Sequence, residues 1–187
     1  MQTREAGAEL DSPLQSVAEA AWTPLVTALL VLLPGLVGLA IGRPTLFPSL
    51  GPTALLQART PDHPSTRFYN VVVAHLIGLG SAFLMVTIFG IAHARSAFEV
   101  GELSWSRVLA ASLAVGLSAL VDTLLRAPHP PSAATTLLAS LGAFHPSVRD
   151  TVTFVIGVLI VAVAGELCRH LRLRGVDSPR ARDGVRS

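Results

Sequence analysis

Four stretches of the chain carry almost no charge, and each is long enough to cross a bilayer, which takes about 20 residues in a helix. They cover about residues 22–41, 68–92, 107–125 and 150–168. Charged residues make up only 14% of the chain, against about 25% in a typical soluble domain. The sequence therefore predicts an all-α integral membrane protein with four transmembrane helices.

Two segments between these stretches have a different, broken character. Residues 43–67 and 126–149 are rich in proline and too interrupted for a full transmembrane helix. In the first, Ser49 suits a helix N-cap and Pro52 suits the first helical turn, which predicts two or three turns of helix after them. In the second, the apolar piece Ala133–Leu141 predicts a similar short helix. We expect two short broken or re-entrant helical segments.

The two broken segments are copies of each other, 82 residues apart. Pro48 matches Pro130, Thr53 matches Thr135, and Leu55-Leu56 matches Leu137-Leu138. The run from His63 to Arg67, His-Pro-Ser-x-Arg, returns at residues 145–149 in the same register. The chain therefore consists of two internally repeated units, at about 22–92 and 104–172.

The repeat leaves two arrangements open. If each broken segment dips into the membrane and returns, the repeats are parallel, and this is the arrangement we favour from the sequence. If each segment crosses fully, the repeats are inverted. In both, a polar N-terminal tail over residues 1–20 precedes a membrane domain over 21–172, and a basic tail over 173–187 follows.

The two terminal regions predict how the protein is oriented in the cell membrane. The acidic N-terminal region does not resemble a cleavable signal peptide, so the first apolar stretch is expected to be retained. The tail from Arg169 is basic, which predicts a cytoplasmic C-terminus by the positive-inside tendency, with the N-terminus on the same side.

Duplicated units with proline-broken segments in matching places point to a transport site. A half-helix that begins inside the membrane leaves its first amide groups unpaired, and these donors, together with the helix dipole, attract an anion. The expected anion site is therefore formed by the paired half-helix N-termini. Its candidate residues are Ser49, Gly51, Thr53, Asn70, His75, Arg126, His129, Pro130, Pro131, Ser132 and Thr135.

Each candidate also has a structural interpretation. His129 with Pro130 and Pro131 forms either a rigid turn or a site-lining turn in which His129 donates hydrogen bonds or carries a proton. Arg126 is either an interfacial side chain or an attractor for the anion, in which case its removal should weaken anion flux. Asn70 is expected to bind a carbonyl of a broken segment, and His75 is either a structural or a pathway residue.

The run from Arg126 to Thr135, Arg-Ala-Pro-His-Pro-Pro-Ser-Ala-Ala-Thr, resembles the signature of the HPP family of integral membrane proteins. Residues 49–54, Ser-Leu-Gly-Pro-Thr-Ala, resemble the family's first broken segment, and Asn70 and His75 fall where its second span has Asn and His. Ser-Ala-Ala after the tripeptide, and Phe68-Tyr69 before Asn70, depart from the family pattern. The resemblance implies a four-span membrane domain and nitrite-like anion transport.

Other classes of function fit the sequence less well. The single cysteine, the scattered histidines and the scarcity of aromatic residues indicate no metal site, no cofactor and no nucleic-acid partner. No catalytic set of residues is visible, so we do not expect an enzyme. The expected partners are a small anion, the lipid bilayer and further copies of the chain in a homo-oligomer. The alternative is a non-transporting membrane scaffold or sensor, which would show no flux.

Overall fold

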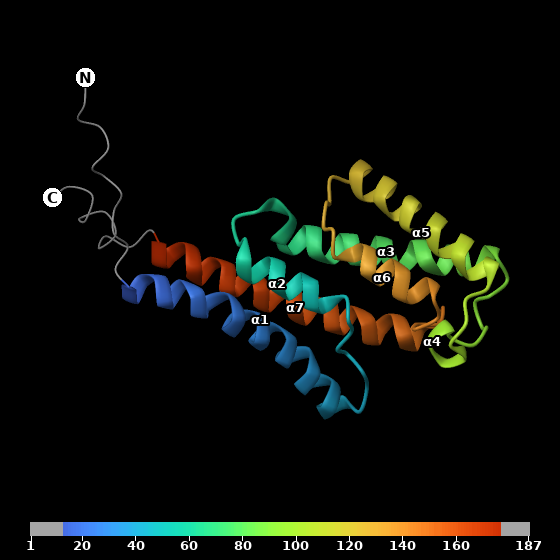
Figure 1. Cartoon of the computed structure of the whole chain (residues 1–187), viewed down its shortest axis with the longest axis horizontal. Helices are drawn as coiled ribbons and strands as arrows, with labels where there is room; N and C mark the ends of the chain where they lie inside the picture. The colour runs from blue at the N-terminus through green and yellow to red at the C-terminus, as the bar shows by residue number, and fades with distance from the viewer. Residues whose placement is uncertain (1–12, 177–187) are drawn as a thin grey trace, which may run out of the picture.

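The computed structural model describes residues 13–176, with side chains from 20 to 172, so the tails expected at 1–20 and 173–187 lie largely outside the described residues. Within this part every regular element is a helix (Figure 1). The elements are α1 Pro13–Ile41, α2 Leu50–Arg59, the 3-10 turn η1 Pro64–Thr66, α3 Phe68–Ile88, α4 Ala97–Val100, α5 Trp105–Leu124, α6 Ser132–Ser140 and α7 Val148–Val176.

Four of these helices are long and apolar enough to cross a membrane, as the sequence predicts. They contain the stretches Ala20–Ile41, Phe68–Ile88, Trp105–Leu124 and Val148–Arg172. The short helices α2 and α6 fall in the two broken segments, also as predicted. The all-α membrane fold with four long and two short helices is therefore confirmed.

The contacts along α7 fix the direction of α1 and α3. Arg172, near the end of α7, lies over the ring of Trp22, and Gly157, nearer its beginning, lies against Thr45 just beyond α1. The backbone N–H of Phe68 donates to the Glu166 carboxylate, whereas His75, two turns later on α3, packs on Phe154. Both helices therefore run antiparallel to α7 and parallel to each other.

Because α1 and α3 run the same way, the chain between them must return to its starting end, and it does so through α2. Gly157 of α7 lies against Phe47, and Gly165, two turns on, lies against Gln57, so α2 runs parallel to α7. Figure 1 shows α1, α3 and α6 running in one direction and α2, α5 and α7 in the other.

The two repeats are therefore inverted relative to each other. The first consists of α1, α2 and α3, the second of α5, α6 and α7, and every matched pair of helices points in opposite directions. The parallel arrangement that we favoured from the sequence, in which each broken segment dips and returns, is wrong. Hydropathy does not reveal helix direction, which is why the sequence left this choice open.

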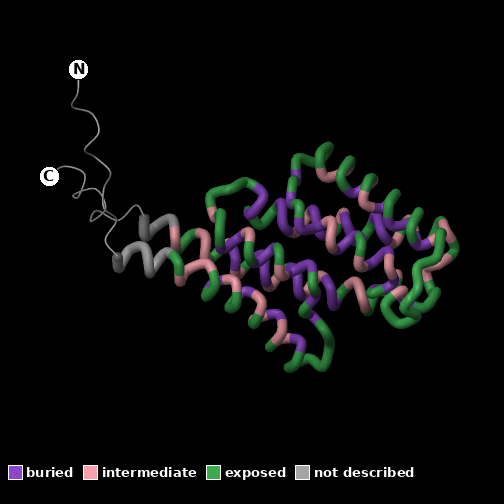
Figure 2. Tube along the Cα trace, viewed as in Figure 1, coloured by how far each residue is buried: buried purple, intermediate pink, exposed green. Residues whose placement is uncertain are grey.

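The helices that match by repeat also match in burial. Along α1 and α5 the apolar stretches are 22% and 28% buried within the chain, whereas along α3 and α7 they are 44% and 39% buried. Figure 2 shows the buried residues concentrated where α2, α3, α6 and α7 meet, with α1 and α5 outside them. The two short helices thus lie in the interior of the bundle, where a transport site is expected.

Candidate functional site

The N-terminal ends of α2 and α6 meet inside the bundle. A tight, proline-containing turn precedes each helix, because proline at 48, 130 and 131 disfavours continuation of a helix through these positions. Thr53 and Thr135 are each the fourth residue of their helix, and both are fully buried. These two residues are equivalent in the repeat, and one side chain joins them.

That side chain is His75 on α3, which is completely buried. Its Nε2 lies 3.0 Å from the Thr53 hydroxyl oxygen, and its Nδ1 lies 2.7 Å from that of Thr135. Gly78, one turn further along α3, lets α6 approach closely, because a Cβ there would stand 2.6 Å from the Thr136 hydroxyl. The imidazole thus bridges the first turns of the two half-helices.

A second buried histidine completes the arrangement. Nε2 of His129 lies 3.0 Å from the Thr53 hydroxyl, and its Nδ1 lies 2.8 Å from the Ser65 carbonyl oxygen. The centres of the His75 and His129 rings are 5.1 Å apart. We call Thr53, His75, His129 and Thr135 the His–Thr cluster. It places four polar side chains, all buried, in the middle of a bundle of apolar helices.

The hydrogen bonds of the His–Thr cluster have one consistent direction when both rings are neutral. The Ser65 carbonyl can only accept, so Nδ1 of His129 carries a hydrogen and its Nε2 accepts from the Thr53 hydroxyl. The Thr53 oxygen then accepts from Nε2 of His75, whose Nδ1 accepts from Thr135. This assignment follows from the partners, and it makes the cluster one continuous chain of donors.

The amide groups at the two helix ends are not bare, contrary to the sequence-based expectation. In α2, the N–H of Leu50 donates to Phe47 O at 2.9 Å and that of Gly51 to Pro48 O at 3.3 Å. In α6, the first three amides donate to the carbonyls of residues 129–131. The tight turns before each helix thus satisfy these groups locally. Side chains, rather than free amides, supply the polar contacts between the half-helices, while the helix dipoles remain.

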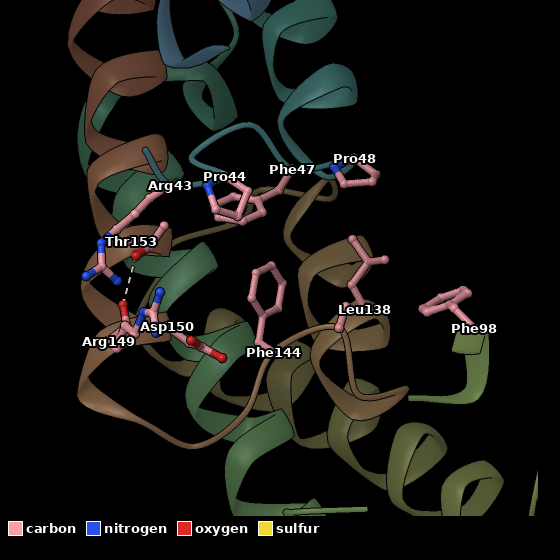
Figure 3. Close-up of a pocket in the computed structure, with 11 residues that line it drawn as sticks. Arg43, Pro44, Phe47, Pro48, Phe98, Leu138, Phe144, Arg149, Asp150 and Thr153 are labelled. Atoms are coloured by element: carbon pink, nitrogen blue, oxygen red, sulfur yellow. Dashed lines mark hydrogen bonds between the residues drawn. The ribbon is translucent and has the colours of Figure 1, made fainter. Parts of the chain in front are cut away.

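A pocket of about 540 Å³ opens beside the beginning of α2, at the end of the bundle where α1 ends at Ile41 and α7 begins at Val148 (Figure 3). Figure 3 shows Arg43, Arg149 and Asp150 gathered on one side of it, Phe47 and Phe144 at its centre, and Leu138 and Phe98 on the other side. We call this the arginine pocket. Sequence reasoning did not join Arg43 and Arg149, because they are 106 residues apart.

A smaller pocket of about 210 Å³ lies beside the beginning of α6, and we call it the Asp122 pocket. His129, Pro130 and Ser132 line it together with Asp122, whose carboxylate accepts a hydrogen bond from the Ser132 hydroxyl at 3.4 Å. The two pockets share one equivalent turn, since Phe47 and Pro48 line the first and their partners His129 and Pro130 line the second, whereas α7 contributes to the first pocket and α5 to the second. One pocket therefore stands at the beginning of each half-helix.

The repeat is not symmetric in chemistry. The position of His129 is occupied in the first repeat by Phe47, and the position of His75 is occupied in the second by Gly157. Phe47 packs against Phe144 and Phe154 at ring-centre distances of 4.8 and 5.3 Å. An apolar aromatic cluster thus stands between the arginine pocket and the His–Thr cluster, whereas His129 itself lines the Asp122 pocket.

Of the other predicted site residues, four lie in or beside the broken segments, and Arg126 lies away from the cluster. Asn70 donates from Nδ2 to the Pro64 carbonyl at 2.8 Å, which is the contact with a broken segment that we expected. Ser49 holds the N-cap position of α2, but its buried hydroxyl makes no hydrogen bond within the described residues. Gly51 is half-buried and Pro131 is buried in the turns at the helix beginnings. Arg126 is exposed with φ 51° and does not line either pocket, so the structure does not bring it to the cluster.

Sequence reasoning missed the role of Arg107, which marked only the beginning of a span. Its side chain is buried and donates to Ser140 O, at the C-terminal end of α6, and to the carbonyls of Ala94 and Arg95, each at 2.9 Å. A cation at that end complements the negative pole of the α6 dipole. Arg107 thus holds one half-helix against the loop after α3.

The family profile for the HPP transmembrane region matches residues 12–176. The chain belongs to the HPP family. The match covers both repeats, so the His–Thr cluster lies within the family's membrane region. No curated protein and no solved structure matches the chain. Within the described residues, no group of three or more His, Cys, Asp or Glu side chains is placed to hold a metal ion.

Proposed function

We propose that this HPP protein carries a small inorganic anion, nitrite-like by its family resemblance, across the membrane. The observation that carries the proposal is the meeting of two half-helix N-termini at a buried polar cluster. Polar groups inside a membrane bundle are costly and usually mark a substrate pathway. The positive poles of α2 and α6 both point to this place, and together they favour a negative guest.

The proposed path runs from the arginine pocket to the Asp122 pocket. Arg43 and Arg149 provide positive charge at the mouth beside α2 and raise the local anion concentration. The anion then passes the aromatic cluster of Phe47, Phe144 and Phe154 and reaches the hydroxyls of Thr53 and Thr135. Both donate to imidazole nitrogens in the structure and can be turned toward an anion.

The structure represents a closed state in this scheme. Thr53, His75 and Thr135 are completely buried, and His129 is 1% exposed. On the arginine side the barrier is the aromatic cluster, and on the other side it is the His129 ring. Inverted repeats are well suited to alternate between two such barriers, because one repeat can rock against the other around a fixed site.

A flux assay tests the proposal. Purified protein is reconstituted in liposomes, and uptake of nitrite, nitrate, formate and chloride is measured against protein-free vesicles, which report leakage of nitrous acid. Protein-dependent uptake of nitrite, exceeding that of chloride, is expected. Uptake equal to that of protein-free vesicles for all four anions would reject transport and favour the scaffold or sensor.

The surroundings of the path are also part of the proposal. The exposed apolar side chains of α1 and α5, such as Leu39, Leu109 and Leu120, suit contact with lipid or with further copies of the chain. We expect a homo-oligomer in the cell membrane with cytoplasmic termini. Mass measurement in detergent or nanodiscs checks the assembly, since a monomeric mass would exclude the homo-oligomer without affecting the path within one chain.

A further inference from the structure

The Thr53 hydroxyl has two acceptors within reach but only one hydrogen. Its oxygen lies 3.0 Å from Nε2 of His129 and 3.1 Å from the Ser49 carbonyl oxygen. When His129 is neutral, the hydroxyl hydrogen points to Nε2, because Nδ1 already donates to Ser65. The Ser49 carbonyl is then the unused alternative.

This alternative lets the cluster take up a proton with one bond rotation. A protonated His129 donates from both nitrogens, and the Ser65 carbonyl remains the partner of Nδ1. The new N–H at Nε2 can donate to the Thr53 oxygen once that hydroxyl turns to Ser49. Every donor keeps an acceptor. Nε2 of His75 still donates to the Thr53 oxygen, which accepts this bond with its second lone pair.

His75 has no such provision. A proton added at its Nδ1 would point at the Thr135 oxygen, and the Thr135 hydrogen would need another acceptor. Among the residues that the structure describes, the Thr135 hydroxyl bonds only to His75. The geometry therefore singles out His129 of the two buried histidines as the one that can hold an extra proton.

The groups around His129 set the conditions for this proton. The titratable neighbours are His75 on α3 and Asp122 on α5, and His63 lies one residue further away, bonded to the side chain of Ser65 whose carbonyl His129 contacts. From α2 and α6, the hydroxyls of Thr53 and Ser132 face His129. The positive poles of α2 and α6 oppose an imidazolium in an empty site. An anion bound between them removes that penalty, because a buried charge is tolerated when it is paired.

We propose that His129 is a proton-binding site loaded together with the transported anion, so that the protein moves one proton with each anion. This inference rests on the transport function proposed above. Coupling is reciprocal, so bound anion favours the proton and the proton favours the anion. His129 lines the Asp122 pocket, so its proton exchanges with that side of the membrane when the site is open there, and with the arginine side when the aromatic barrier opens, in each case together with the anion.

The first experiment compares wild type with His129→Gln in liposomes containing a pH-sensitive dye. Glutamine can donate and accept hydrogen bonds but does not titrate. In the wild type, nitrite uptake should acidify the lumen and be insensitive to membrane potential. In His129→Gln, the uptake that remains should occur without acidification and should rise several-fold at an inside-positive potential of about 100 mV, since the moving charge is no longer neutralised. His145→Gln, an exposed histidine of the second repeat, is the control and should stay coupled.

The outcomes separate the two proposals. No nitrite uptake by the wild type would reject the transport function itself. Nitrite uptake by the wild type without proton movement, or unchanged coupling in His129→Gln, would reject only the role of His129.

A second measurement needs no folded variant. Wild-type protein labelled with ¹⁵N-histidine in nanodiscs is titrated by NMR with and without nitrite. Nitrite should shift the pH at which one buried histidine is half protonated to a higher value, by at least one pH unit if the coupling is tenfold. An identical titration in both samples would overturn the inference.

Discussion

Thr53 and Thr135, equivalent positions of the two repeats, bind opposite nitrogens of the same imidazole, His75, at 3.0 and 2.7 Å. A duplicated residue thus meets an unduplicated one, because the second repeat has Gly157 where the first has His75. The inverted repeats bring the two threonines together. Because there is only one histidine between them, the hydrogen bonds from Thr135 through His75 to Thr53 run in one direction. This combination underlies both the proposed path and the proposed proton site.

The inverted topology predicts where each loop faces. In a Cys168→Ser background, single cysteines replacing Asp62, in the loop after α2, and Glu99, in α4, are labelled with a membrane-impermeant thiol reagent in intact cells. Glu99→Cys should be on the side opposite the termini, and Asp62→Cys on the same side as the termini, because α2 returns the chain across the bundle.

Parallel repeats with dipping segments give the reverse pattern, with position 62 opposite the termini and position 99 beside them. A fluorescent fusion at the C-terminus provides the reference side. If position 62 is labelled from the side opposite the termini, the inverted arrangement is contradicted, and so is the meeting of the half-helix ends.

Close packing of α3 on α6 predicts that Gly78→Ala destabilises the protein. A Cβ at Gly78 would stand 2.6 Å from the Thr136 hydroxyl and 3.0 Å from the Ser132 carbonyl. Overpacking of this kind costs roughly 1–3 kcal/mol, which should appear as a lower unfolding temperature in detergent. Gly80→Ala on the same helix is the matched control, since no described atom lies within 4 Å of the added Cβ. Equal effects of the two substitutions would disprove this contact.

Arg107 should contribute to stability through its hydrogen bonds rather than through surface charge. Arg107→Gln removes a buried guanidinium and leaves the carbonyls of Ser140 and Ala94 short of a donor, at roughly 1–3 kcal/mol for each buried group. Arg95→Gln, which breaks only an exposed pair with Glu99, should cost less than about 1 kcal/mol. Urea- or SDS-induced unfolding compares the two, and a larger loss for Arg95→Gln would contradict the assignment.

The arginine pocket predicts a role for Arg149 that Arg126 lacks. Arg149→Gln should lower nitrite uptake at sub-saturating nitrite by roughly 3- to 10-fold, because it removes positive charge from the proposed mouth. The deficit should shrink as ionic strength rises, since salt screens exposed charges. Arg126→Gln, which removes an exposed arginine that lines neither pocket, serves as the control. A stronger effect at Arg126 would restore our sequence-based expectation and move the mouth to the other end.

The sequence predicts those features that depend on local pattern. Charge-free stretches predict the four long helices, the match from Pro48 to Arg67 predicts the repeat, and a polar Asn70 in a span predicts its bond to a broken segment. Helix direction was missed because the hydropathy of a helix is the same in both directions. The paired amides were missed because the turns before α2 and α6 depend on local dihedral angles rather than on residue type.

Long-range contacts account for the rest of what the sequence left open. His75 and His129 are 54 residues apart and on different elements, so only the packed bundle shows that both touch Thr53. Arg107 reads as the boundary of a span until the end of α6 is placed beside it. Arg126 stood close to the signature in sequence, yet it lies at positive φ in the turn after α5, and its side chain is exposed.

Thr53→Val offers the most direct test of the central claim, that the meeting point of α2 and α6 is the anion path. Valine keeps the shape but removes the hydroxyl that contacts His75 and His129 and that the proposed path offers to the anion, and a hydrogen bond to a charged group contributes about 1.5–3 kcal/mol, where 1.4 kcal/mol corresponds to tenfold. Nitrite uptake into liposomes should fall at least about 10-fold relative to Thr60→Val, which removes an exposed hydroxyl bonded to Leu56 O on the same helix. Equal uptake by the two variants, both folded, would contradict the claim.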